Sequence, residues 1–576
     1  MTRRWIGRAL TVAVLSTVAA AGAVNLQAQD DPADLVLRGG RVAIVDDDFT
    51  ITQAVAVRGY QIVASGTDAQ MDAYIDADTE VIELDGRLAI PGFNEGHGHF
   101  LGLGRAKMIL DLNGVSSWDG IVAMVEAKAR ELEPGEWIFG RGWHQEKWEH
   151  TPMPNVDGVP LHHGLSEVTP DNPVVLTHAS GHAAFVNELA MQLAGLTDDT
   201  EDPDGGTIVR DANGHATGML RETAQGFVRR ATSDAEEMSD ADRDAEFRLQ
   251  VQLAGQAALE NGVTSFQDAG TGFGGIDRLR AMAAAGELPV RLYVMVRGAS
   301  HAQLDARLPD YRIIPEGNDF LAVRGFKHSI DGALGPHGAW LLEPYEDMPE
   351  SAGLETTPVD VIEKTAAIAI KHGFQLNTHA IGDRANREVL DLYERAFESA
   401  GIDGSERRWR IEHSQHLHPD DIPRFAGLGV IASMQGIHCT SDAPWVFRRL
   451  GAERAESGAY MWSDLIDSGA VVTNGTDVPV EDISPIASYY ASVSRRMADG
   501  EVFFADQRMT REEALRSYTT WAAYAAFEEH LKGQLLPGML ADITVLSQDI
   551  LTVPEEQIPA TQIDFTIIGG EVRYRR

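Results

Sequence analysis

The stretch from Pro91 to Phe100, "PGFNEGHGHF", places His97 and His99 one residue apart. It overlaps an apolar run, "RLAIPGF", that is typical of a buried strand. Because residues i and i+2 of a strand point to the same face, both imidazoles are directed into one interior. Imidazole is a common metal ligand, so the pair is a candidate metal site. Taken alone, the pair is equally compatible with a structural role.

Four further ionisable residues stand at or near the ends of other short apolar runs. Lys327 lies in "FKHSIDG", His379 in "NTHAIGD", His413 in "RIEHSQ" and Asp477 in "NGTDVP". Imidazoles and a carboxylate together suit Zn²⁺ or a similar borderline metal, and without a metal they would leave buried polar groups poorly paired. A lysine in such a position is unfavourable unless its charge is paired or its chemistry altered. Isolated histidines are interpreted as structural or surface residues: His144, His162, His163, His301 and His530.

The elements that must position these residues form a repeating pattern from about residue 262 to 480. Seven apolar runs, from "GVTSFQDAG" to "AVVTNGTDVP", are separated in several places by helical patterns such as "DVIEKTAAIAIKHG" and "NREVLDLYERAFESAG". With "RLAIPGF" the runs number eight. Eight βα units predict an α/β fold of the TIM-barrel type, whose strands end at one shared mouth. Ligands far apart in the sequence would then become neighbours.

The two ends of the chain have a different pattern, with short alternating segments and turns. We expect residues 29–90 and 531–576 to combine into one small antiparallel β-sandwich. The barrel would span residues 91–530. Residues 101 to about 250 are too long for one connection between a strand and a helix, and we therefore interpret them as an inserted subdomain that follows the first barrel strand.

The first 28 residues have the pattern of a signal peptide. Arg3, Arg4 and Arg8 precede "ALTVAVLSTVAAAGAV", an apolar run that is short for a membrane-spanning helix. Ala23 and Ala28 end plausible cleavage sites. We expect cleavage, a periplasmic or secreted protein and no stable membrane association afterwards; an uncleaved anchor is the alternative.

Composition excludes several classes of partner and chemistry. The 576 residues carry a formal net charge of −39, which disfavours nucleic acid and anionic membranes as partners. One cysteine, Cys439, excludes an intrachain disulfide. Gly270, Gly272 and Gly275 match the G-x-G-x-x-G pattern of dinucleotide sites, but Glu287 precedes the next strand where an acid should follow it. We therefore reject a nicotinamide cofactor.

The sequence resembles the amidohydrolase superfamily, in its YtcJ-like branch related to N-substituted formamide deformylase. The matching motifs occur in the family's order and cover almost all of the chain after residue 28. His144 stands where an aspartate is common in this branch, and Glu95 where the superfamily usually has aspartate. The matching motifs are "PGFNEGHGHF", "GRGWHQEKW", "FKHSIDGALGPHGAWLLEPY", "NTHAIGDRAN", "RIEHSQ", "SMQGIHCTSDAPW", "NGTDVPV" and "KGQLLPGMLADITVL".

The resemblance implies a metal-dependent hydrolase of C–N bonds in amides, cyclic amides or formamides. It implies two zinc ions, with Lys327 carboxylated on its amine to bridge them. Asp477 would pass a proton from the attacking water to the leaving nitrogen, and His379 would help to stabilise the oxyanion. The implied metal ligands are His97, His99 and Asp477 for one ion and His379 and His413 for the other.

Several points stay open at this stage. The site could hold one metal and leave Lys327 unmodified, the substrate could be an ester or a lactone, or the chain could be a silent periplasmic binding protein. The partner we expect is a small amide-like molecule, and a homodimer is a family expectation. Five residues are candidates for substrate contact or for a supporting role, with a structural role equally compatible: Trp143, His182, Asp331, His337 and Asp383.

Overall fold

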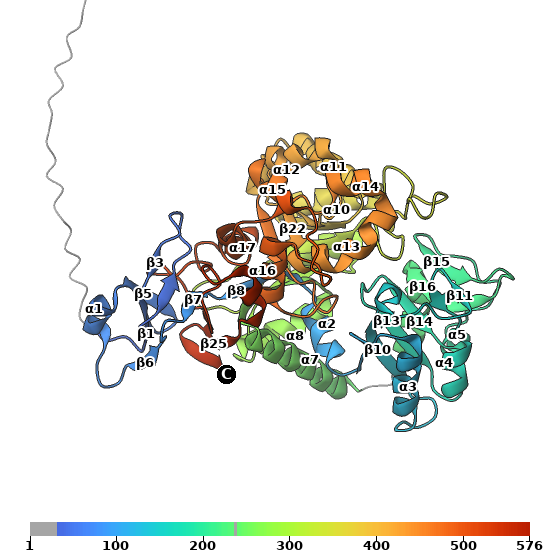
Figure 1. Cartoon of the computed structure of the whole chain (residues 1–576), viewed down its shortest axis with the longest axis horizontal. Helices are drawn as coiled ribbons and strands as arrows, with labels where there is room; N and C mark the ends of the chain where they lie inside the picture. Colours follow the sequence, from blue (N-terminus) through green and yellow to red (C-terminus); the bar gives the residue numbers. More distant parts are fainter. Residues whose placement is uncertain (1–30, 236–238) are drawn as a thin grey trace, which may run out of the picture.

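The computed structural model describes residues 31–235 and 239–576. The predicted signal peptide, residues 1–28, lies outside this range. Within the described residues, no helix has both the length and the apolar character needed to cross a membrane. The chain is arranged as a central barrel with sheets from the chain ends on one side and the segment between the first two barrel strands on the other (Figure 1).

An eight-stranded parallel sheet forms the barrel, which confirms the predicted fold. Its first and last strands, β8 and β23, lie next to each other, so the barrel is nearly closed. Gly96 permits this approach, because a Cβ atom there would lie 2.4 Å from the Asn474 carbonyl oxygen. The strands, in sheet order, are β8 (Phe93–Gly98), β17 (Val263–Thr271), β18 (Arg291–Val296), β19 (Leu321–Ser329), β20 (Gln375–Ala380), β21 (Arg410–His413), β22 (Ile431–Gln435) and β23 (Val472–Gly475).

The first barrel strand differs from the prediction. The run "RLAIPGF" is divided between β7 (Leu88–Pro91), which belongs to a sheet built from the chain ends, and β8, which begins at Phe93. Pro91 ends β7, and Gly92 lies against Thr264, where a side chain would collide. The chain therefore passes from one sheet to the other within two residues.

Helices cover the outside of the barrel, as the helical patterns predict. α10 (Val359–His372) and α11 (Asp383–Ala400) follow β19 and β20. In α11 the buried residues Val389, Tyr393 and Phe397 recur every four positions, so they form one apolar stripe. The helix ends at Gly401, whose φ of 62° is the left-handed conformation that glycine adopts without strain.

The chain ends form two sheets that enclose a common apolar core. One has the order β5-β4-β1-β6, and the other contains strands from both ends in the order β26-β25-β24-β7-β2-β3. We expected only antiparallel pairing, but β1 pairs with β6 and β2 with β7 in parallel. Longer connections, not tight turns, return the chain to these neighbours. The strands are β1 (Leu35–Arg38), β2 (Arg41–Ala43), β3 (Ile51–Thr52), β4 (Ala54–Arg58), β5 (Gln61–Gly66), β6 (Glu80–Glu83), β24 (Ile543–Leu546), β25 (Ile563–Ile568) and β26 (Glu571–Arg575).

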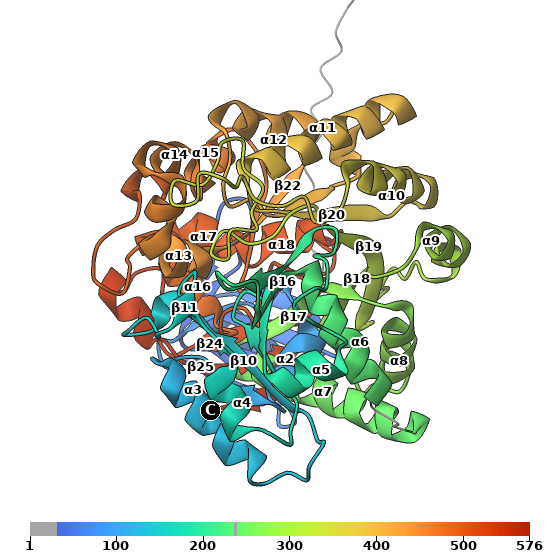
Figure 2. The ribbon, with the colours of Figure 1, turned by 90° about the vertical axis from the view of Figure 1, so that its right-hand side faces the viewer.

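The segment between β8 and β17 contains a sheet of its own, in the order β15-β16-β14-β13-β10-β9. Trp118 of α3 (Trp118–Ala129) and Trp143 belong to its separate apolar core. Viewed from this side, the segment lies across one end of the barrel (Figure 2). Its strands are β9 (Leu110–Asp111), β10 (Ile138–Trp143), β13 (Val174–His178), β14 (Ala183–Val186), β15 (Gly206–Arg210) and β16 (Ala216–Glu222).

Candidate active site

The predicted ligands come together at one end of the barrel. His97 lies near the end of β8, and His99 begins α2 (Phe100–Ala106) directly after it. His379 lies in β20, and His413 ends β21. Because parallel strands end at the same rim, residues from five separate parts of the sequence line one cavity. The predicted ligands that line this cavity are His99, Lys327, His379, His413 and Asp477.

Asp477 lies at the centre of this group, two residues beyond β23. Its Oδ1 is 3.4 Å from His97 Nε2 and 3.3 Å from His99 Nε2, and its Oδ2 is 4.0 Å from His413 Nδ1. Its φ of 56° is left-handed, a conformation that aspartate tolerates better than most residues. The Asp477 N–H donates to the His97 carbonyl oxygen at 2.8 Å, which holds the two loops together. Burial opposes ionisation, but the nearby His97 and His99 outweigh it and hold the pKa of Asp477 well below its usual range.

Glu412 supports His97 from inside the barrel, and the sequence analysis missed it. His97 Nδ1 bonds to Glu412 Oε2, so Nε2 is left to face Asp477 and Lys327. Arg410 pairs with the same carboxylate, with Nε 2.7 Å from Oε1. Burial alone would raise the pKa of Glu412, but Arg410 and His97 outweigh it and lower that pKa. Alternation along β21 gives the signal, since Arg410 and Glu412 share one inward face.

The imidazoles of His99, His379 and His413 favour the neutral form, which is the form that binds metals. Desolvation lowers the pKa of His99 to about 4, and it lowers the pKa of His379 and His413 well below the usual histidine value. Neutral imidazole has a free nitrogen lone pair, whereas imidazolium has none. The rings of His379 and His413 meet edge to face with centroids 4.5 Å apart.

Lys327 is buried against the same histidines. Its Nζ lies 3.2 Å from His97 Nε2, and desolvation lowers the pKa of Lys327 to about 8. A larger share of this amine is therefore uncharged near neutral pH than for an exposed lysine.

Two of the secondary candidates, His182 and Asp331, also line the cavity. His182 comes from the turn between β13 and β14, and its Nδ1 lies 2.7 Å from Glu222 Oε2. Burial lowers the tendency of His182 to protonate, but Glu222 outweighs it and raises the pKa. Asp331 accepts hydrogen bonds from the N–H groups of Ile381, Gly382 and Trp340 and lies 3.4 Å from His379 Nε2.

The other three candidates do not line the cavity, which favours structural or supporting roles. Trp143 is buried in the core of the inserted sheet, where its Nε1 donates to the Leu176 carbonyl oxygen at 2.8 Å. His337 pairs with Asp347 at 3.2 Å. Asp383, at the start of α11, accepts hydrogen bonds from the backbone N–H groups of Leu342 and Arg384.

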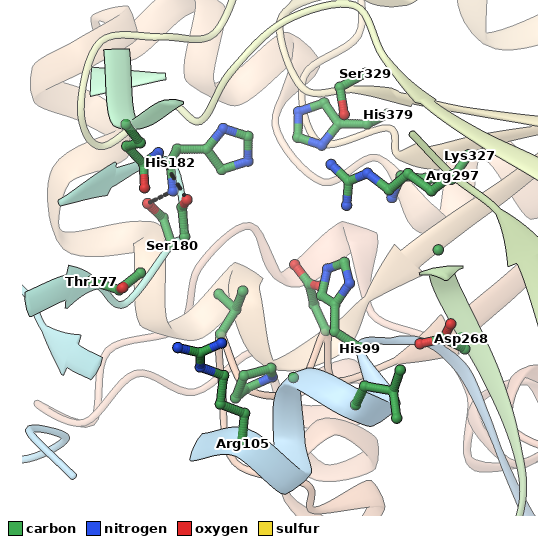
Figure 3. Close-up of a pocket in the computed structure, with 18 of the residues that line it drawn as sticks. His99, Arg105, Thr177, Ser180, His182, Asp268, Arg297, Lys327, Ser329 and His379 are labelled. Carbon is green, nitrogen blue, oxygen red and sulfur yellow. Dashed lines mark hydrogen bonds and ion pairs between the residues drawn. The ribbon is translucent and has the colours of Figure 1, made fainter. Parts of the chain in front are cut away.

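The site opens into two cavities that share His182, His379, His413 and Asp477. The larger has a volume of about 750 Å³ and the smaller about 60 Å³. Figure 3 shows His182, His379 and His99 on different sides of the larger hollow, with Arg297 extending into it. Most of the open space beside the ligand cluster therefore lies in the larger cavity.

The residues present fit a divalent metal ion. His97, His413 and Asp477 each offer a ligand atom, and these atoms lie within 4.8 Å of one another. His379 Nε2 and Asp477 Oδ1 are buried and form no hydrogen bond within the described structure. Buried polar atoms without partners are unfavourable, and coordination would satisfy both.

Comparison with known proteins finds similarity along most of the chain. Residues 80–574 match the family described as "Amidohydrolase family". The chain is 33% identical to Protein LONG AFTER FAR-RED 3 of Arabidopsis thaliana, over 94% of this chain and 92% of that protein. It is 30% identical to the putative amidohydrolase YtcJ of Bacillus subtilis (94% and 99%) and 27% identical to the N-substituted formamide deformylase of Arthrobacter pascens (94% and 98%).

Solved structures agree with the fold. An uncharacterized metal-dependent hydrolase from Pyrococcus horikoshii superimposes with a TM-score of 0.71 at 24% identity, covering 91% of this chain and 99% of that one. A second, from Pyrococcus furiosus, has a TM-score of 0.69 at 27% identity, covering 90% and 100%.

Proposed function

The chain belongs to the amidohydrolase family and is a metal-dependent hydrolase; from this premise we propose that it hydrolyses the C–N bond of an amide, a cyclic amide or a formamide-like group. The observation that carries this proposal is the Asp477 carboxylate, which lies beside the nitrogens of His97 and His99 and projects into the cavity. The similarity to an N-substituted formamide deformylase supports the choice of a C–N bond.

We propose that the site holds two zinc ions, with His97, His99 and Asp477 around one and His379 and His413 around the other. A carboxylated Lys327 would lie between them. A divalent metal supplies a water molecule whose pKa falls from 15.7 to about 7, which is a nucleophile at neutral pH. The low pKa of Lys327 supports this assignment, because only an uncharged amine reacts with CO₂.

Asp477 moves the proton in this scheme. Its carboxylate takes a proton from the attacking water, because it is ionised and adjoins the ligand histidines. It then donates that proton to the leaving nitrogen, and the C–N bond breaks. The strained backbone at Asp477 holds the carboxylate in place during both steps.

His182 is the residue best suited to stabilise negative charge on the substrate carbonyl oxygen. Glu222 keeps its imidazole protonated more readily than usual, and its ring centroid is 5.1 Å from that of His379. A fixed cationic donor of this kind stabilises an oxyanion as it forms. His379, whose Nε2 would be occupied as a metal ligand, would support this oxyanion only through the metal that it helps to hold.

A substrate panel tests the reaction. Zinc-loaded protein is incubated with formamides, N-acyl amino acids, hydantoin-like rings and lactones, and products are measured by mass spectrometry. We expect turnover of at least one amide class and slower turnover of lactones. Turnover of lactones alone would contradict the C–N assignment, and elemental analysis of the same sample distinguishes one metal from two.

A further inference from the structure

Arginine side chains without acidic partners line the larger cavity. Across residues 31–235 and 239–576, no carboxylate oxygen lies within 4.0 Å of the guanidinium nitrogens of Arg105, Arg141 or Arg297. Arg229 also lines this cavity. The chain has 87 acidic and 48 basic residues, so an acid is readily supplied wherever only structural pairing is required. The absence, among the described residues, of a carboxylate close to Arg105, Arg141 and Arg297 therefore points to an anionic ligand.

Three acidic residues of the same cavity, Asp268, Glu222 and Asp331, hydrogen-bond to groups other than Arg141 and Arg297, although Asp268 attracts Arg297 electrostatically. Asp268 accepts from the Phe100 N–H at 2.9 Å and from Thr271 Oγ1 at 2.7 Å. Glu222 bonds to His182, and Asp331 accepts three backbone N–H groups. If one of these acidic side chains rotated to pair with an arginine, it would lose the hydrogen bonds that it already makes.

Arg297 is placed to meet a substrate. It follows β18 directly, at the same rim as the metal-type ligands, and its side chain is solvent-accessible. Its guanidinium extends toward the hollow bounded by His379 and His99 (Figure 3). Gly270 allows this position, because a Cβ atom there would lie 2.5 Å from Arg297 Cδ. Gly270, the first glycine of the G-x-G-x-x-G pattern, thus leaves room for the Arg297 side chain.

Arg141 reaches the same cavity from the inserted sheet. Its Nε donates to the Pro479 carbonyl oxygen at 3.1 Å and its Nη2 to the Ala179 carbonyl oxygen at 2.9 Å. Both acceptors are uncharged, so the positive charge is oriented but not neutralised. Desolvation lowers the pKa of Arg141 to about 10, because the more distant Asp477 offsets the cost of burial only in part.

We propose that Arg297 and Arg141 form a subsite for an anionic group on the substrate, a carboxylate or a phosphate, so that the enzyme prefers negatively charged amides. This inference rests on the proposed function and names its substrate class. Guanidinium groups bind either anion through paired hydrogen bonds, and the geometry is more specific than a lysine would provide. A cationic wall also attracts an anionic substrate that the acidic surface repels.

Equilibrium binding tests the subsite without requiring turnover. Hippurate and its neutral amide, hippuramide, are titrated calorimetrically into metal-loaded and metal-free full-length protein. We expect tighter binding of hippurate, and R297Q to weaken it about 10- to 100-fold with little effect on hippuramide. R297K retains the positive charge but not the paired donors of the guanidinium group. Its affinity for hippurate should lie between those of the wild-type protein and R297Q. R278Q is the matched control, since Arg278 lies on α8 (Phe273–Ala284) over the Phe247 ring and outside the cavity.

Inorganic phosphate as a competitor distinguishes the anions: displacement of hippurate identifies a site that accepts phosphate, and its absence identifies carboxylate selectivity. Equal affinity of wild-type protein for the two probes, no binding of hippurate in the millimolar range, or an unchanged hippurate affinity in R297Q would overturn the proposal. Hippurate discrimination without C–N hydrolysis would refute only the proposed function. Equal hydrolysis of charged and neutral amides would refute only the subsite.

Discussion

At the scale of single residues, the site depends on pairs in which one side chain fixes the chemical form of another. Glu412 bonds to Nδ1 of His97 and so directs Nε2 toward Asp477 and Lys327. Glu222 raises the pKa of His182 in the same way that a counter-ion would. The sequence indicates the ligands by their positions at strand ends, but it does not reveal these partners, because pairing depends on side chains from different strands.

Replacement of Asp477 by asparagine separates proton transfer from metal binding. We expect D477N to lower kcat about 10²- to 10⁴-fold, because the amide cannot accept the proton of the attacking water. Metal content should fall only modestly, as measured by elemental analysis. D482N is the control, since Asp482 is exposed in the same loop and lines neither site cavity. Unchanged turnover in D477N would refute the role assigned to Asp477.

Replacement of Glu412 by glutamine tests the support of His97. The variant keeps an oxygen acceptor but loses the charge that orients the imidazole, so we expect metal affinity to fall about 10- to 100-fold. Competition with a chromogenic chelator measures this directly. Circular dichroism should be recorded in parallel, because Arg410 loses its counter-charge. Wild-type affinity in a folded E412Q protein would be inconsistent with the proposed support.

At the scale of elements, the barrel brings the ligands together only if its first and last strands close. Gly96 of β8 lies against the Asn474 carbonyl oxygen of β23, and Gly475 lies against the His97 backbone. These contacts fix the distance between the two loops that carry His97 and Asp477. The hydrogen bond from the Asp477 N–H to the His97 carbonyl oxygen then sets their register.

A side chain at position 96 should therefore weaken the closure. We expect G96A to lower the free energy of unfolding by about 1–3 kcal/mol, because the added methyl group displaces backbone and not a flexible side chain. G427A is the control: Gly427 lies in α12 (Ile422–Leu428) with open space around it, and alanine should stabilise the helix by up to about 1 kcal/mol. Denaturant titrations give both values, and equal stability of the two variants would contradict the closure argument.

The sequence predicts the eight barrel strands well because each apolar run carries its own signal. It places the first strand too early, since "RLAIPGF" is equally apolar where it leaves one sheet and enters the next. Arg297 lies at the end of a predicted strand, as His379 does. Arginine does not bind metal ions, so a pattern of metal-ligand residue types does not include it. Trp143 shows the opposite limit: its motif suggests substrate contact, but burial of an indole in a separate core is visible only in three dimensions.

At the scale of the whole molecule, the barrel lies between two further units, which are formed by different parts of the sequence. The chain ends form sheets on one side, and the inserted sheet covers the other and supplies His182 and Arg141 to the cavity (Figures 1 and 2). The site is thus completed by residues from outside the barrel. Variation in the inserted segment would alter the substrate and leave the ligand cluster intact.

The N-terminal segment makes a separate prediction about the mature protein. We propose export with cleavage, because Arg3, Arg4 and Arg8 precede a short apolar run. Intact mass spectrometry of protein recovered from the periplasm or medium should give a chain that begins after Ala23 or Ala28. Recovery of only the full-length chain, retained in the cell, would refute export.

Metal dependence of hydrolysis is the most direct test of the account. The rate of turnover of the best amide in the panel is measured before chelation, after removal of metal by dialysis against a chelator, and during titration with zinc. We predict loss of activity on chelation and full recovery at about two equivalents of zinc per chain. Turnover that persists in demonstrably metal-free protein would contradict the central claim that this site hydrolyses its substrate with metal-activated water.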